Sequence, residues 1–156
     1  AEILAGSALG ARNQDTFRRA VAACTLWGLG GAVVTSLVLL LAGPLMISLI
    51  TSLPQVRLSA ETYLWWLIAS PLISVWSFLL DGIFIGATRT AAMRNAMMLS
   101  LGVFLLANWL LVPLWGNHGL WLSMTLFLAA RAVTLGLHYP ALERSVGAGR
   151  RSVEAG

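Results

Sequence analysis

The chain has 156 residues, of which 58% are hydrophobic and 10% are charged, and its formal net charge is +4 at pH 7. A soluble domain carries about 25% charged residues, so this composition excludes an ordinary water-soluble protein. Together with a mean hydropathy of +0.83, it predicts an all-α polytopic membrane protein, a bundle of transmembrane helices.

The first predicted element is the end of a helix. Residues 1–11, AEILAGSALGA, are too few to span a bilayer, so we expect the last turns of a helix that starts upstream, in a chain that is a fragment. Residues 12–19 are predicted to be a short basic loop. The first full span follows at 21–42, and Gly43-Pro44 then favours a kink or a break.

The second span follows a predicted loop at 51–61. Pro54 marks this loop, and Ser59 is a candidate cap for the next helix. The span then covers 61–86. Pro71 lies inside it, which a membrane helix tolerates where neighbouring groups satisfy the freed carbonyl.

The last two spans are expected to form a hairpin. The third span covers 95–114 and follows a short basic connection at 87–94. A tight polar turn at 115–119 leads into the fourth span at 120–141. The polar, glycine-rich residues 142–156 are expected to be a disordered cytoplasmic tail, so the transmembrane part ends at residue 141.

The arginines are distributed unevenly between the two sides of the predicted membrane. Eight lie in the first, third and last polar segments, whereas Arg57, opposed by Glu61, is the sole arginine on the other side. The positive-inside rule therefore predicts a multi-pass protein with a cytoplasmic carboxyl terminus. We expect it in the inner (plasma) membrane. The tryptophans at the opposite ends of the spans agree with an aromatic belt. They are Trp65, Trp66, Trp115 and Trp121.

The sequence contains few other features that point to a ligand, a metal or a catalytic activity. A pI of about 10.6 would suggest nucleic acid as the partner of a soluble protein, but here we expect membrane lipid and no nucleic acid. Cys24 is the single cysteine and cannot form an internal disulfide. The chain has no zinc motif, nucleotide fingerprint or Ser–His–acid set, so we expect no metal, no cofactor and no enzymatic activity.

Polar residues recur along the second span at helical steps of four, three, four and seven. The five residues are Ser70, Ser74, Ser77, Asp81 and Thr88. Such spacing places them on one face, which we expect to turn toward other helices or a wet cavity. The opposite face is apolar and suits lipid.

Asp81 is the strongest functional candidate. A carboxylate at the centre of a membrane helix costs about 2.5–3.5 kcal/mol on insertion scales, and such residues usually line a pathway or pair with another charge. Arg131 is the other charge inside a span, at a similar predicted depth. The two could therefore pair, or Arg131 could snorkel toward the headgroups. A purely structural role for Asp81 is the alternative to a coupling role.

Other residues suggest helix packing. Asn108, in the middle of the third span, needs a partner on another helix or contacts a substrate. Two GxxxG patterns, Gly6 with Gly10 and Gly82 with Gly86, permit close approach of helices.

The strings "AEILAGSALGARNQDTFRRAV" and "LLDGIFIGATRTAAMRNAM" resemble the multidrug and toxic compound extrusion (MATE) transporters, in particular their DinF-type branch. The resemblance implies the end of helix 8 and helices 9 to 12 of a twelve-helix transporter. The missing amino-terminal lobe would then be a partner. It also implies export of cationic or amphipathic compounds, driven by inward H⁺ or Na⁺. Asp81 matches the acidic residue on helix 10 that the family associates with cation coupling.

We expect Ser74, Ser77, Asn108 and Arg131 to line or support the transport path beside Asp81. Two other functions are compatible with the sequence. A flippase for lipids or lipid-linked precursors would need several cations in its cavity, and Arg131 alone is available inside the spans. A non-transporting membrane subunit is the third possibility.

Overall fold

The computed structural model describes residues 1–10 and 14–154, so Arg12 of the predicted first loop lies outside the described residues. The helices in the described residues are α1 (Glu2–Gly10), α2 (Gln14–Ile50), α3 (Pro54–Gly86), α4 (Thr90–Trp115) and α5 (Asn117–Glu154). The last four are long and apolar enough to cross a membrane. This arrangement confirms the predicted all-α membrane bundle with four long spans, and α1 is a short fifth helix beside them.

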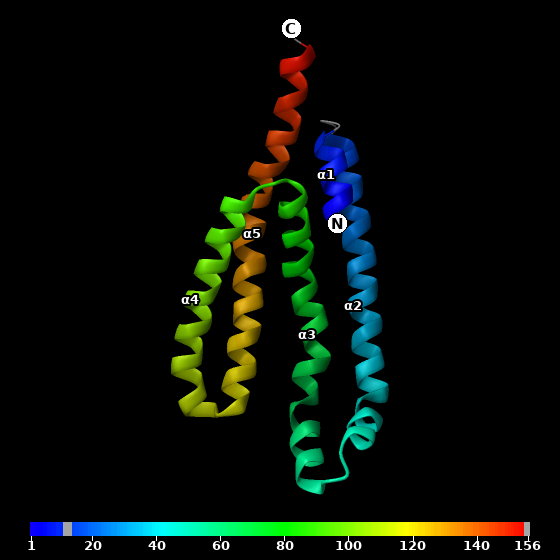
Figure 1. Cartoon of the computed structure of the whole chain (residues 1–156), viewed down its shortest axis with the longest axis vertical. Helices are drawn as coiled ribbons and strands as arrows, with labels where there is room; N and C mark the ends of the chain where they lie inside the picture. The colour runs from blue at the N-terminus through cyan, green and yellow to red at the C-terminus, as the bar shows by residue number, and fades with distance from the viewer. Residues whose placement is uncertain (11–13, 155–156) are drawn as a thin grey trace.

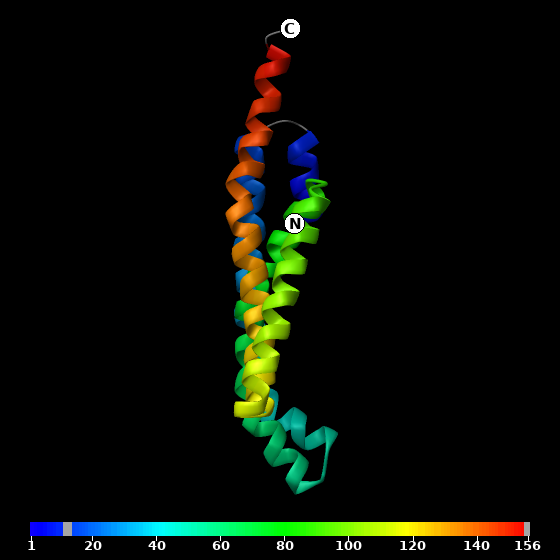
Figure 2. The same cartoon turned by 90° about the vertical axis from the view of Figure 1, so that its left-hand side faces the viewer.

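The four long helices alternate in direction and lie roughly alongside one another (Figure 1). α2 packs mainly against α3, and α4 against α5, while α3 also contacts α5 and joins the two hairpins. The short α1 packs against α2 and α3 at the end of the bundle from which α5 projects. Seen from the side, the bundle is a narrow layer (Figure 2).

The connections are shorter than the polar segments suggested. The 51–61 loop is reduced to residues 51–53, because Pro54 begins α3 in the first turn, where a missing N–H costs nothing. Ser59 therefore lies inside the helix and does not cap it. Most of the predicted 12–19 loop is likewise the first part of α2. Polar residues indicate where a helix emerges from the hydrocarbon core of the membrane. They do not indicate where the helix ends, because the backbone hydrogen bonds of the helix can continue outside the membrane.

Two helices also extend past their predicted ends. α2 continues through Pro44 to Ile50, and its last turns bend aside together with the start of α3 (Figure 2). The bend agrees with the expected kink, since Pro44 removes one backbone hydrogen bond. α5 runs through residues 142–154 as a helix, where the composition suggested disorder.

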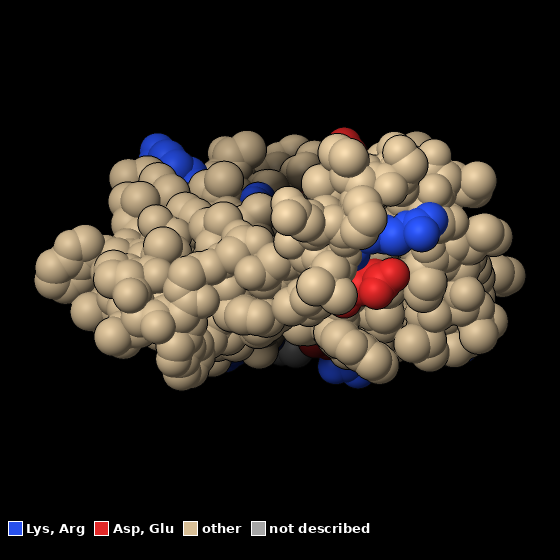
Figure 3. Space-filling model, turned by 90° about the horizontal axis from the view of Figure 1, so that it is seen from below, with Lys and Arg blue, Asp and Glu red and all other residues tan. Residues whose placement is uncertain are grey.

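The core is concentrated where α1 and the beginning of α2 meet the ends of α3 and α5. Its largest members, all nearly inaccessible, are Phe17, Ile83, Phe84, Leu135, Leu142 and Val146. Elsewhere most large apolar side chains face outward, and the end of the bundle seen from below shows only scattered charges (Figure 3). An apolar outer surface of this extent suits lipid.

Glycines let α1 approach α3 closely. A Cβ on Gly6 would lie 3.2 Å from the carbonyl oxygen of Gly86, and one on Gly82 would lie 3.1 Å from the Cβ of Ala1. A Cβ on Gly86 would overlap the Glu2 carbonyl oxygen and come within 3.0 Å of the Gly6 nitrogen. Gly10, by contrast, faces open space. Three of the four predicted packing glycines thus lie in one helix contact.

Gly86→Ala is expected to destabilise the full-length protein by about 1–3 kcal/mol, because the added methyl meets backbone atoms that cannot rotate away. The thermal unfolding midpoint in detergent measures this loss. Gly102→Ala in α4 is the matched control, since no atom lies within 4 Å of its added Cβ. The control should be unchanged or slightly more stable. Equal midpoints for the two variants would contradict the packing role of Gly86.

Candidate functional site

Asp81 of α3 and Arg131 of α5 form an ion pair inside the bundle. The Arg131 Nε donates to Asp81 Oδ1 at 3.0 Å, and Arg131 Nη2 lies 3.0 Å from Asp81 Oδ2. Two parallel bonds from one guanidinium to one carboxylate are the strongest geometry available to such a pair. The side chains are 13% and 18% exposed. Arg131 therefore pairs with Asp81 instead of snorkelling.

The direction of the helices explains the pairing. α3 and α5 both run toward the same end of the bundle, so residues at similar distances from that end lie at the same depth (Figure 1). Asp81 lies near the end of α3, on the face that meets α5. Its cost in the hydrocarbon is offset by a partner on a neighbouring helix.

α4 supplies a third contact that the sequence analysis did not identify. Arg131 Nη1 donates to the Met97 Sδ at 3.2 Å. A methionine in an apolar helix gives no sequence signal of such a role, because its thioether is only a weak acceptor. The guanidinium of Arg131 thus binds a strong acceptor on α3, the Asp81 carboxylate, and a weak acceptor on α4, the Met97 thioether.

Four of the five residues that the spacing placed on the polar face of α3 lie in that helix, and Thr88 does not. Ser70 and Ser74 donate to carbonyls of their own helix, those of Leu67 and Pro71. Ser77, one turn before Asp81, is fully buried, and its hydroxyl has no hydrogen-bond partner. Thr88 is not on this face, because α3 ends at Gly86 and Thr88 adopts a φ of 55° in the connection.

Asn108 is not brought to the ion pair by any hydrogen bond that the structure shows. Its Oδ1 is buried and without a partner. Two other buried hydroxyls are satisfied within their own helices: Ser100 donates to the Ala96 carbonyl, and Ser123 of α5 donates to the Gly119 carbonyl. A buried amide oxygen without a hydrogen-bond partner is costly. The contacts within the described residues therefore do not explain why an asparagine occupies position 108.

Polar contacts also tie the helices at both ends of the bundle. At the end holding the α3–α4 connection, Arg18 of α2 pairs with Glu143 of α5, which also accepts from Gln14 at 3.3 Å. At the other end, Trp66 Nε1 donates to His118 Nδ1 at 3.1 Å. In the described residues no three His, Cys, Asp or Glu side chains gather as a metal site would require.

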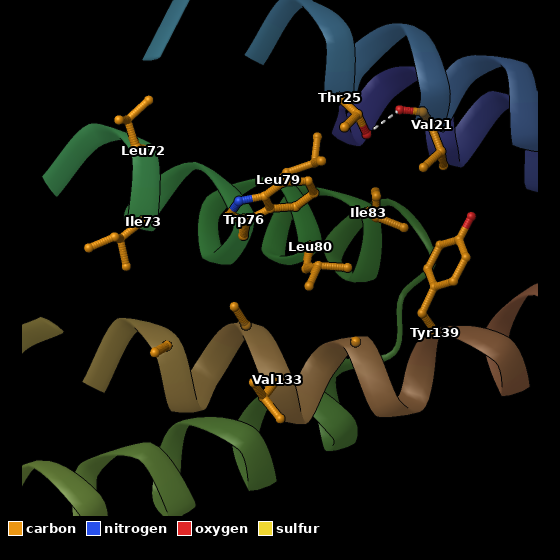
Figure 4. Close-up of a pocket in the computed structure, with 13 residues that line it drawn as sticks. Val21, Thr25, Leu72, Ile73, Trp76, Leu79, Leu80, Ile83, Val133 and Tyr139 are labelled. Atoms are coloured by element: carbon orange, nitrogen blue, oxygen red, sulfur yellow. Dashed lines mark hydrogen bonds between the residues drawn. The ribbon is translucent and has the colours of Figure 1, made fainter. Parts of the chain in front are cut away.

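An apolar groove of about 670 Å³ runs between α2, α3 and α5 (Figure 4). Leu72, Trp76, Leu79 and Ile83 line its α3 side, and the ring of Tyr139 lies at one end. Neither Asp81 nor Arg131 lines it. The groove and the ion pair therefore belong to different faces of α3.

The helix directions place the arginines as the sequence predicted. The start of α2, the α3–α4 connection and the end of α5 lie at one end of the bundle (Figure 1). The arginines with described side chains at this end are Arg18, Arg19, Arg89, Arg94 and Arg144. Arg57 lies at the opposite end, near the start of α3.

Comparison with known proteins gives two matches. A family model described as MatE matches residues 1–110. The chain is also 45% identical over 138 residues to "DNA damage-inducible protein F" of Escherichia coli (strain K12). The aligned region covers 86% of this chain and 29% of that relative, so the chain spans less than a third of the relative's length. No solved structure matches the chain.

Proposed function

The chain belongs to the MatE family, and from this membership we propose that it forms part of a secondary-active exporter. In this proposal the complete transporter exports cationic or amphipathic compounds across the inner membrane and takes up H⁺ or Na⁺ in exchange. The chain contributes helices of one lobe and works together with an amino-terminal lobe. Asp81 is the residue that binds the coupling ion or the cationic substrate.

One observation supports this proposal above the others. Asp81 is an ionisable side chain in an apolar membrane helix, and it faces another helix and a counter-charge instead of lipid. A carboxylate in that position can exchange one cation for another inside the helix bundle, as alternating access requires. Ser74 and Ser77 lie on the same face of α3 and would extend the path.

Neither alternative has comparable support. A flippase for lipids or lipid-linked precursors needs several cations to hold a phosphate or pyrophosphate. Arg131, the one arginine inside the spans, is already neutralised by Asp81. For a non-transporting subunit, the ion pair would serve helix packing alone, and the membership in a transporter family does not favour that function.

The proposal is tested with the purified full-length transporter in proteoliposomes. An inward H⁺ or Na⁺ gradient should drive export of a cationic dye such as ethidium, and collapse of the gradient with an ionophore should stop it. Dye movement that is independent of both gradients, or no movement at all from correctly folded protein, would contradict antiport.

The proposed orientation has its own test. We expect a cysteine at position 61 (Glu61→Cys) to react with a membrane-impermeant maleimide in intact cells, whereas one at position 94 (Arg94→Cys) reacts only after permeabilisation. Both native side chains are exposed, at opposite ends of the bundle. The arginine-rich end should be cytoplasmic because of the positive-inside rule. Cys24→Ala removes the one thiol of this chain, any cysteine elsewhere in the full-length protein is replaced as well, and the opposite labelling pattern would overturn the orientation.

A further inference from the structure

We propose that Arg131 is a tethered competitor for Asp81, which occupies the carboxylate until a substrate cation or a coupling ion displaces it. This inference rests on the proposed function and assigns Arg131 a role within it. Arg131 then acts as a positioning and specificity-determining residue. It does not itself contact the exported compound.

The geometry of the pair carries the inference. Arg131 Nε and Nη2 each contact a different oxygen of Asp81, both at 3.0 Å. A cation that arrives at Asp81 therefore meets a carboxylate whose charge is already balanced. To gain the full attraction of that carboxylate it has to displace at least one of the two guanidinium bonds.

The other contact of Arg131 makes displacement feasible. Its Nη1 donates to the Met97 sulfur at 3.2 Å, and a thioether is a weak acceptor. Asp81 thus supplies the strong part of the attachment. Once another cation takes Asp81, the guanidinium keeps only this weak contact to Met97 and remains beside the site as an unpaired positive charge.

The charge balance explains what such a competitor achieves. The empty pair is neutral, and a monovalent substrate or a coupling ion leaves a single positive charge at the site. Both cations at once would leave two positive charges in a medium that screens them poorly. Without Arg131, binding of the substrate and the coupling ion together would leave a net charge of only +1 at the site. The positive charge of Arg131 therefore disfavours simultaneous binding of the substrate and the coupling ion at this site. Electrostatic repulsion of this kind is one way in which a protein achieves specificity.

The test measures binding of tetraphenylphosphonium, a monovalent lipophilic cation, to the purified full-length transporter by calorimetry. Arg131→Gln should lower the Kd by about tenfold or more, because the competitor is gone and the carboxylate is free. Arg131→Lys keeps the charge but loses the two-pronged geometry, and it should tighten binding to a smaller extent. Arg94→Gln removes the same charge from an exposed position on α4 and should leave the Kd unchanged.

The outcomes separate this inference from the proposed function. Unchanged or weaker binding by both folded Arg131 variants would overturn the competitor role. Unchanged binding by Asp81→Asn would instead overturn the assignment of Asp81 as the cation site. If Arg131→Gln does not yield folded protein, Arg131→Lys decides the question alone. The cation should also raise the unfolding midpoint of that variant more than it raises that of the parent.

Discussion

Asp81→Asn is expected to reduce drug efflux by the full-length transporter to the background of cells without it. Asparagine has nearly the same shape and keeps one oxygen that can accept from Arg131, but it cannot ionise. The site then has no negative charge to attract a substrate cation or a coupling ion. The measurements are drug resistance of cells and the initial rate of ethidium efflux, normalised to the amount of transporter in the membrane.

Glu61→Gln is the matched control for this substitution. It makes the same chemical change in an exposed acid at the opposite end of α3, so efflux should be unaffected. Efflux that persists in Asp81→Asn at a normal protein level would exclude a coupling role for Asp81. The pair with Arg131 would then be purely structural.

Arg131→Met is expected to destabilise the transporter by about 3–5 kcal/mol, because it leaves the Asp81 carboxylate buried among helices without its counter-charge. Substituting both partners, Asp81→Asn with Arg131→Met, removes the two charges together. The double variant should therefore recover most of the lost stability, since neutral groups of similar volume replace a buried ion pair at little cost. Unfolding midpoints in detergent measure both effects, and the double-mutant cycle gives the coupling between the two residues.

The reciprocal exchange, Asp81→Arg with Arg131→Asp, separates pairing from transport. It keeps both charges in the membrane but moves the acid from α3 to α5. We expect the exchanged protein to be more stable than either single variant, because both charges still have a partner. We expect it to be inactive in transport, because the carboxylate no longer lies on the same face of α3 as Ser74 and Ser77. Restored efflux would mean that the position of the acid is unimportant. Strictly additive effects of the single substitutions would mean that the two residues do not interact.

The spans and the identity of the paired charges were predictable for simple reasons. A long uncharged segment can hardly be anything except a membrane helix, and an acid inside such a segment needs a partner. With Arg131 as the other charge inside a span, the choice of partner was narrow. The choice between pairing and snorkelling depended on how α3 and α5 are rotated and tilted, and local sequence does not encode these quantities.

The helix ends and the smaller contacts were predicted less well. Pro54 and Ser59 suggested a loop, yet the backbone there is helical from Pro54 onward, because a proline fits the first turn of a helix as readily as a loop. Thr88 matched the periodicity of the serine face but falls in a connection after α3 ends. The contact from Arg131 to Met97 had no sequence signal, since a methionine is expected on any apolar helix face.

The sequence by itself determined that this protein is a bundle of membrane helices, which ends of those helices carry the arginines, and that Asp81 either lines a pathway or pairs with another charge. Hydropathy and charge decide these properties locally, residue by residue. The tertiary structure decided that Arg131 is the partner of Asp81, that Met97 holds its remaining nitrogen, and that Gly6 and Gly86 bring α1 against α3. These are distances between helices far apart in the chain, and they depend on how the whole bundle packs.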